Sequence, residues 1–488
     1  MAITPGSNLN QVEMPQVASA ANYLDFADGS SGNDWSQQYL PDLMEKEAEV
    51  FGKRTIAGFL EKVGAEEAMQ SDQVVWSEQG RLHLSYKATL DSSAETMEIS
   101  HDVDGNAVTT THGIRVNDML LITSATATAR GVCTLAPAND ATVTVELYDG
   151  ADIQTTFGTS AVVQVLVYGS EYGKGQSYST STSAVGTVSS RTSNEPQFKS
   201  FSNKPIIMKD FYSINGSDTS QIGWVEISQE NGPSGYYWYL KAEGETRMRF
   251  ADYMEMAMLE SVKATNLGSM TLDTLVNGAG EAFGTQGLFD AVSKRGNTTS
   301  GVTGTNAATD LAEFDAILAE FDKQGAIEEY MMFIDRSTSL AIDDMLASMN
   351  SYGAGGTSYG VFDNDENMAL NLGFSGFRRG SYDFYKSDFR YLNDKATRGG
   401  LIDTVNNIRG IMIPAGTSTV YDQSLGKNLK RPFLHVRYRA SKTDNRKFKT
   451  WTTGSVGAAT SSLDAMEIHM LSERCLITQG ANNFMMMQ

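Results

Sequence analysis

Short stretches rich in apolar residues occupy the middle of the chain and predict strands. Between residues 100 and 185, three such stretches are rich in β-branched residues, and turn signals such as Asp149-Gly150 separate them. The three are Met119–Thr123, Ala141–Leu147 and Ala161–Gly169. Their close and regular spacing predicts a small β-barrel or sandwich over residues 100–185.

A longer pattern at helical spacing comes later in the chain. The run Tyr237–Glu260 contains no proline, and apolar or small residues recur in it every three or four positions. These are Leu240, Gly244, Met248, Ala251, Met254 and Met258. Glu243 with Arg247, and Glu245 with Arg249, have the spacing and order of stabilising ion pairs on one helix. We therefore predict a single helix about 35 Å long, which needs a large surface to lie along.

The remaining elements mix helices and strands. A helix is predicted near Asp310–Gln324, with an apolar stripe of Leu311, Phe314, Ile317, Leu318 and Phe321. Strands are predicted at Pro205–Gly216, Glu328–Asp335, Gly410–Gly416, Arg431–Ala440 and Met466–Ile477, and a further helix at Ser337–Met349. The order predicts an α+β fold, and no internal repeat suggests a solenoid or a propeller.

Two stretches carry too few apolar residues to fold alone. Residues 1–35 are polar and small, and residues 176–204 are rich in Ser and Thr. The first is expected to be an extended arm. The second is either a disordered linker or an arm that becomes ordered only against a partner.

Composition narrows the function further. A formal charge of −21 over 488 residues argues against general nucleic-acid binding, which needs clustered Lys and Arg. The two cysteines, Cys133 and Cys475, match no metal-binding spacing. The N-terminus shows no secretory signal, and no apolar run is long enough to span a membrane. We expect a protein of a reducing compartment with no membrane partner.

The residues that usually carry chemistry form no convincing site, so no catalytic, cofactor-binding or metal-binding residue and no cofactor is predicted. His101 and His112 are the nearest histidine pair, across a turn. Residues 363–367 begin like a calcium loop, but Met368 and Phe374 stand where Gly and Glu are needed. The glycine cluster 277–284 lacks the GxGxxG spacing. Asp343 and Asp344 are expected on a charged helix surface, because adjacent helical residues do not share a face.

One segment reverses the charge of the chain. Residues 427–449 carry nine Lys and Arg against a single acid, Asp444, whereas residues 1–70 are acidic. The segment is either a basic strand face with its loop or a docking surface for acidic parts of a neighbouring copy. Non-specific contact with DNA is a weaker alternative. Candidate contact residues between subunits are Arg191, Glu195, Lys199, Lys204, Lys430, Arg431, Arg437, Arg439, Arg446 and Lys447.

The order of these elements resembles the major capsid proteins of tailed bacteriophages with the Hong Kong 97 fold. The likeness is sharpest from Arg191 to Glu260. There, RTSNEPQFKSFSNKPIIMKDFYSINGS looks like the distal strand of the extended loop, and YYWYLKAEGETRMRFADYMEMAMLES looks like the spine helix. Residues 100–185 resemble the small domain that some of these proteins insert in that loop. The C-terminal third is similar to capsid proteins of the crAss-like phages.

The resemblance implies a division of the chain. Residues 1–70 would form an N-terminal arm with short helices, residues 71–99 and 186–230 the extended loop, and residues 100–185 the inserted domain. A peripheral domain with the spine helix would cover 231–335, an axial α/β domain 336–455, and strands returning to the body 456–488. The prototype of the Hong Kong 97 fold crosslinks its subunits through a Lys and an Asn. These residues cannot be matched to positions of this sequence, so no autocatalytic crosslink is expected.

The resemblance also implies a function. The chain would be a structural, non-enzymatic subunit that assembles with itself into pentamers and hexamers of an icosahedral shell around packaged double-stranded DNA. Assembly would occur in the bacterial host cytoplasm, with scaffolding, portal and head-decoration proteins as partners and only non-specific DNA contact on the inner surface. Two alternatives remain: an adhesin or tail protein that uses residues 100–185 to bind a ligand, and a cytoplasmic enzyme.

Overall fold

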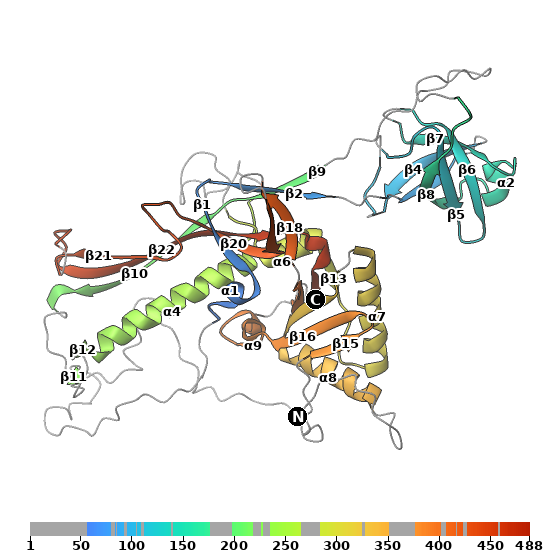
Figure 1. The fold of residues 1–488 in the computed structure, drawn as a ribbon. Helices are drawn as coiled ribbons and strands as arrows, with labels where there is room; N and C mark the ends of the chain where they lie inside the picture. Colours follow the sequence, from blue (N-terminus) through green and yellow to red (C-terminus); the bar gives the residue numbers. More distant parts are fainter. Residues whose placement is uncertain are drawn as a thin grey trace. The chain divides into compact units, whose positions relative to one another are not determined.

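The computed structural model describes most of the chain after residue 55. The described residues are 56–79, 83, 85–91, 95–103, 105–108, 112–137, 140–175, 198–217, 226–227, 235–264, 284–324, 327–350, 376–401, 407–415, 417–422, 427–456 and 459–488. The predictions for residues 1–35, 277–283 and 363–367, and for Arg191 and Glu195, lie outside them. The chain divides into two compact units (Figure 1): Gln73–Asn203 forms one, and Met1–Asp72 with Lys204–Gln488 forms the other.

The first unit holds a closed six-stranded barrel. Its strands are β3 (Ser85–Leu90), β4 (Thr96–Asp102), β5 (Asp118–Thr123), β6 (Thr128–Leu135), β7 (Thr142–Leu147) and β8 (Val162–Ser170). They close in the order β3-β4-β7-β6-β5-β8, and all six neighbouring pairs are antiparallel. Alternate side chains point inward, and the short helix α2 (Ile153–Phe157) adds Ile153 and Phe157 to the interior. The predicted β domain is therefore a barrel.

The barrel begins earlier than the sequence suggested. Strands β3 and β4 include residues that had been assigned to the extended loop at 71–99. Tyr86, Ala88 and Leu90 alternate into the barrel core. Ser85, Lys87 and Thr89 take the outward positions, so this six-residue strand alternates polar and apolar residues as a half-buried strand does.

A two-stranded ribbon precedes and follows the barrel in the chain. Strand β2 (Val74–Gln79) pairs antiparallel with β9 (Phe198–Asn203), from Val74 opposite Asn203 to Gln79 opposite Phe198. Trp76 and Phe201 lie opposite each other with ring centroids 6.1 Å apart. Val75 on the other side of the ribbon is 62% exposed. Two strands alone bury too little apolar surface to be stable in water.

The second unit contains a long mixed sheet. Its strands are β1 (Ala65–Met69), β10 (Ile206–Asn215), β20 (Leu434–Arg439), β21 (Lys449–Gly454) and β22 (Ala465–Thr478). The order is β1-β20-β22-β10, and β21 pairs with β22 beyond the end of β20. Only the β1–β20 pair is parallel. The strands predicted at Pro205–Gly216 and Met466–Ile477 are confirmed as β10 and β22.

The predicted long helix is confirmed as α4 (Tyr237–Glu260), which runs beside β10 and β22 (Figure 1). Phe250 and Met254 pack against Ile468 and Met470 of β22. The predicted apolar stripe is confirmed at Met254 and Met258, which are buried. It is wrong at Met248, which is exposed, and it leaves out Phe250, which is buried. Apolar residues lie on several sides of this helix, so contact with the sheet, and not spacing alone, selects the buried face.

A second sheet carries helices α7 (Ala307–Gln324) and α8 (Arg336–Asn350). Its order is β13-β23-β17-β14-β16-β15. The strands are β13 (Asn297–Thr299), β14 (Glu329–Ile334), β15 (Gly376–Arg379), β16 (Tyr382–Asp388), β17 (Gly410–Pro414) and β23 (Met485–Met487). Phe314, Ile317 and Phe321 of α7 are buried in the core between helices and sheet, and Leu311 and Leu318 pack at its edge. The predicted stripe of α7 is confirmed.

Smaller elements complete this unit. Helices α1 (Phe59–Val63), α6 (Leu288–Arg295) and α9 (Arg390–Asn393) flank a core shared with Met258 and Leu259 of α4. Strands β18 (Thr417–Asp422) and β19 (Lys427–Pro432) form a separate hairpin, and β11 (Glu226–Ile227) pairs with β12 (Gly235–Tyr236).

The borders expected at residues 335 and 455 do not separate sheets. The second sheet takes β14 from before the first border and β23 from after the second, whereas β20 and β21 belong to the first sheet. Strands distant in the sequence pair in both sheets, and the order of elements along the chain does not reveal such pairings.

Candidate functional site

An ionic network lies where β1, β20 and β22 meet the turn between β20 and β21. Because β1 runs parallel to β20, Glu67 stands opposite Arg437, and the two form an ion pair at 2.7 Å between Oε2 and Nη2. Lys447, in the turn between β20 and β21, forms an ion pair with Glu66 of β1. Arg439 pairs with Asp72, three residues after β1 ends. The network therefore holds the segment from which the chain continues into the ribbon.

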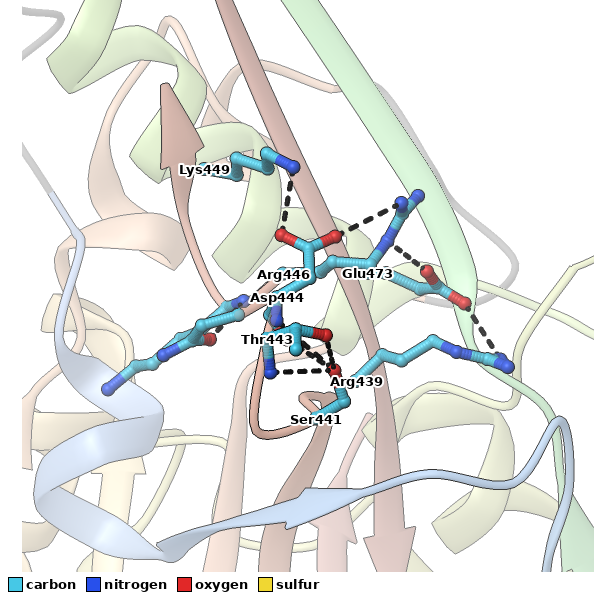
Figure 2. A network of polar contacts seen from close by, with 9 residues as sticks. Arg439, Ser441, Thr443, Asp444, Arg446, Lys449 and Glu473 are labelled. Atoms are coloured by element: carbon cyan, nitrogen blue, oxygen red, sulfur yellow. Dashed lines mark hydrogen bonds and ion pairs between the residues drawn. The ribbon is translucent and has the colours of Figure 1, made fainter. Parts of the chain in front are cut away.

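Glu473 of β22 is the centre of this network (Figure 2). Its side chain is 7% exposed and pairs with both Arg439 and Arg446. Asp444 lies between Arg446 and Lys449, with Lys449 Nζ 2.8 Å from its carboxylate. The hydrogen bond from Lys449 lowers the pKa of Asp444 below its ordinary value.

The turn itself is preorganised by Ser441. Its hydroxyl accepts the backbone N–H groups of Thr443 and Asp444 at 3.3 and 3.1 Å, which is a Ser/Thr turn (Figure 2). The turn places Asp444 and Arg446 beside the strands. The single acid of the basic segment is thus part of the network.

These contacts change the interpretation of the basic segment. Arg437, Arg439, Arg446 and Lys447, all candidates for contact between subunits, are engaged by carboxylates of their own chain. The partners of Arg437, Arg439 and Lys447 on or just after β1 lie more than 360 positions away in the sequence, so no local signal could have revealed these pairs. Their role toward another subunit stays a prediction.

The other candidate contact residues are scattered. Lys199 Nζ lies 5.8 Å from the ring centroid of Phe201 on the ribbon. Lys204 begins the second unit and has a partner within the chain. Lys430 and Arg431 belong to β19, but their side chains are not among those described. Among the candidates with described side chains in the second unit, the structure gathers Arg437, Arg439, Arg446 and Lys447 in the ionic network. For the others, a role between subunits stays a prediction.

Helix α4 fixes the start of the described chain with two carboxylates. Asp252 Oδ1 accepts the backbone N–H of Ile56 at 2.9 Å and that of Ala57 at 3.1 Å. One turn further, Glu255 accepts the N–H groups of Gly58 and Leu60 through its two oxygens, each at 3.2 Å. Acidic acceptors at the start of α1 satisfy N–H groups that have no partner inside the helix. No local pattern in the sequence indicates this anchor, because its partners lie about 195 positions apart.

Glu255 is the most buried of these carboxylates, at 6% exposure. Burial raises the pKa of Glu255 above its ordinary value of 4.5, and the N–H groups of Leu60 and Gly58 and the charge of Arg474 offset part of that rise. Burial likewise lowers the pKa of Arg474, which lies near Glu66 and Glu255. The second unit therefore contains a small buried group of charges where α4, β1 and β22 meet.

A pH-dependent stability follows from Glu255. A raised pKa in the folded state means that the contribution of this carboxyl is present below about 4.5 and is lost as pH rises through the folded-state pKa. Glu255→Gln does not titrate, so the stability of the wild type minus that of the variant is expected to fall as pH rises from 4 to 7. Urea unfolding at several pH values measures it. Glu61→Gln, at an exposed position, is the control, and a difference that grows with pH would contradict this reading.

A second buried ion pair lies in the other sheet. Lys386 of β16 contacts Asp343 of α8, with side chains 6% and 10% exposed, and Lys386 Nζ also donates to Ser339 O at 3.2 Å. The expectation that Asp343 belongs to a charged surface is therefore wrong. The helix turns Asp343 toward the sheet, where a lysine of β16 neutralises it.

The structure locates the four residues of the two ion pairs predicted on the long helix. Arg247 lies over the ring of Phe448, 5.3 Å from its centroid, and Glu243 and Arg247 border the same groove. Glu245 and Arg249 both have partners within the chain. Both pairings stay predictions.

In the described residues, no group of three or more His, Cys, Asp or Glu side chains is arranged to hold a metal ion. His112 Nε2 lies 3.1 Å from Asp140 O, and burial lowers the pKa of this histidine. No helix in the described part of the chain has both the length and the apolar character needed to cross a membrane.

Comparison with known proteins gives distant likenesses only. No family model matches the chain, and no curated protein matches it. Among solved structures, the capsid of the cyanophage P-SCSP1u is 9% identical, with 93% of each chain covered and a TM-score of 0.39. A structure from Mycobacterium phage Ogopogo is 9% identical over 93% of this chain and 98% of that chain, with a TM-score of 0.39. The capsid of a native GTA particle is 8% identical over 94% and 98%, with a TM-score of 0.37. Likenesses with TM-scores below 0.5 do not by themselves establish a shared fold or function.

Proposed function

We propose that this protein is the shell subunit of a tailed-phage head, with the domain arrangement of the Hong Kong 97 fold. The observation that carries the proposal is the ribbon β2–β9, which has little core of its own and brackets a closed barrel in the sequence. A two-stranded ribbon gains stability by lying on another surface. In a shell of identical copies, neighbouring subunits supply that surface.

The second unit supports the same proposal. Helix α4 has 24 residues and lies along the paired strands β10 and β22, as a spine helix would lie in a peripheral domain. The sheet with α7 and α8 is a separate layer with its own core, as an axial domain would be. Two segments of the second unit lead toward the parts that would reach neighbouring subunits. The ionic network holds residues 66–72, and the carboxylates of α4 hold residues 56–60.

The mechanism follows from these parts. Rigid sheets would form the wall, and the ribbon, the barrel and the residues before Ile56 would reach adjacent copies through many individually weak contacts. The same chain would fill pentamers and hexamers by small changes at its loops, and closed symmetric contacts would yield a finite shell. Packaged double-stranded DNA would lie inside, with scaffolding, portal and decoration proteins as partners. Membership of the crAss-like group stays a prediction.

Negative-stain electron microscopy of the purified chain tests the proposal. Closed shells, or free pentamers and hexamers, are expected from the chain alone or together with the scaffolding protein of its own phage. A monodisperse monomer or small oligomer under every one of these conditions would show that the protein is not a shell subunit. The barrel would then be examined for ligand binding, as expected of an adhesin or tail protein.

A further inference from the structure

Strand β21 has an unpaired edge in the described part of the chain. It pairs with β22 on one side only, from Lys449 opposite Leu471 to Gly454 opposite Met466. The N–H of Ser455 bonds to Ala465 O of β22, whereas the backbone of Gly454 bonds to Thr460, away from β22. Because backbone groups alternate in direction along a strand, those of Thr452 and Thr450 also point away from β22. No described residue forms a backbone hydrogen bond with them.

An aromatic row ends at this edge. Phe211 of β10, His469 of β22 and Trp451 of β21 stand opposite one another in register. Their rings stack, with centroids 6.2 Å apart between Phe211 and His469 and 5.2 Å apart between Trp451 and His469. Thr453 Oγ1 lies 2.6 Å from His469 Nε2 and orients the imidazole. Phe211 is 59% exposed and Trp451 37%, so the row is open to solvent on the face opposite α4.

On the α4 side, the same edge borders a groove of about 260 Å³. Glu243 and Arg247 of α4 form one wall, and Thr450 and Thr452 form the other, with Ile468 and Met470 beneath. The groove thus carries one acid and one base, four residues apart, beside the centre of β21.

We propose that β21 pairs with β21 of a second copy of this chain, antiparallel and across a two-fold axis at Trp451. A two-fold axis through an antiparallel pair requires one residue to stand opposite itself. We place that residue at Trp451, because this register uses the outward backbone groups of both Thr450 and Thr452. With Trp451 opposite its own copy, Thr450 exchanges two hydrogen bonds with Thr452 of the other chain, and Thr452 does the same with Thr450.

The chemistry on both faces of the edge suits a second copy. On the open face, Trp451 of one copy meets Trp451 of the other. The row of Phe211, His469 and Trp451 is then followed by the same three rings of the second copy in reverse order, which extends the ring stacking across the axis. On the helix face, the axis brings Glu243 of one copy toward Arg247 of the other, and the reverse. Lys449 meets Thr453 and not another lysine, so no like charges stand opposite each other. A shared edge also removes an exposed strand that would otherwise promote aggregation.

Engineered cysteines test this register. Thr450→Cys and Thr452→Cys are made as separate proteins, purified and mixed under mild oxidation. Opposed residues in a hydrogen-bonded pair have Cα atoms about 5.5 Å apart, within disulfide range. Each cysteine lies about 8 Å from its own copy across the axis, beyond that range. The mixture is expected to give at least ten times more disulfide-linked dimer on a non-reducing gel than either protein alone. The native Cys133 and Cys475 are buried and give little background.

A second variant checks the axis itself. Trp451→Cys places cysteines opposite each other in a non-hydrogen-bonded pair, about 4.5 Å apart between Cα atoms, and is expected to form dimers without a mixing partner. Absence of linked dimers in both experiments overturns the inference, including the case in which a different segment or protein covers β21. Shells without these dimers would leave the proposed function intact, whereas dimers from a chain that never builds a shell would support this contact and remove that function.

Discussion

Replacement of residues 80–197 by Asn-Gly is expected to leave the second unit folded and to reduce the yield of closed shells at least tenfold. Gln79 and Phe198 stand opposite each other at the end of the ribbon, so a two-residue turn can join β2 to β9 without a change of register. The core clusters of the second unit contain no residue from 73–203. Its thermal stability is therefore expected to stay within a few degrees of the wild type, by calorimetry.

The barrel supplies the matched control for this deletion. Residues 83–172 include all six strands and the interior core, and are expected to fold and unfold cooperatively when expressed alone. A folded barrel and a folded body would show that the deletion removes a complete domain. Shell yields equal to the wild type would then show that the barrel is a decoration, and that the body alone builds the wall.

Lys386→Met is expected to destabilise the sheet that carries α7 and α8 by about 3–5 kcal/mol. The change removes the ammonium group that balances Asp343, while the carboxylate stays in a site with little solvent. Truncation of one partner of a buried ion pair costs more than the pair itself contributes, because a charge remains in a medium of low polarity. Urea unfolding, followed by hydrogen exchange of amides in β14 and β16, measures the loss.

Two further variants separate charge from packing at this site. Lys386→Met with Asp343→Leu removes both charges, and is expected to recover most of the lost stability. Lys294→Met breaks a pair of the same residue types, Lys294 with Asp290, in which the lysine side chain is 52% exposed. That variant is expected to change stability by less than about 0.5 kcal/mol. Equal effects of Lys386→Met and Lys294→Met would mean that the buried pair is no more important than a surface pair.

The ionic network around Glu473 is a different case. Its arginines are roughly 28–29% exposed, so each pair contributes little to stability on its own. The value of the network lies in position. It joins β1 and Asp72 to two strands from the end of the chain, and thereby fixes the direction in which residues 66–72 leave the second unit.

Local patterns in the sequence determined many of the elements. Strands β5, β7 and β8 of the barrel, the long helix α4, the apolar stripe of α7 and the strands β10 and β22 follow from spacing and β-branched content, whereas β6 was not predicted. These features depend on neighbours within a few residues, so one sequence is enough to predict them. The same holds for the charge reversal at residues 427–449.

Tertiary structure decided what those elements do. Which face of α4 is buried depends on the sheet beneath it, because Met248 and Phe250 are both apolar and only Phe250 meets the strands. Asp343 forms a buried ion pair with Lys386 because α8 packs against β16. The basic segment found carboxylates at Glu66, Glu67 and Asp72 because β1 pairs with β20 across more than 360 residues of sequence. Pairings over such distances leave no periodic signal, since their partners are chosen by the packing of the whole chain.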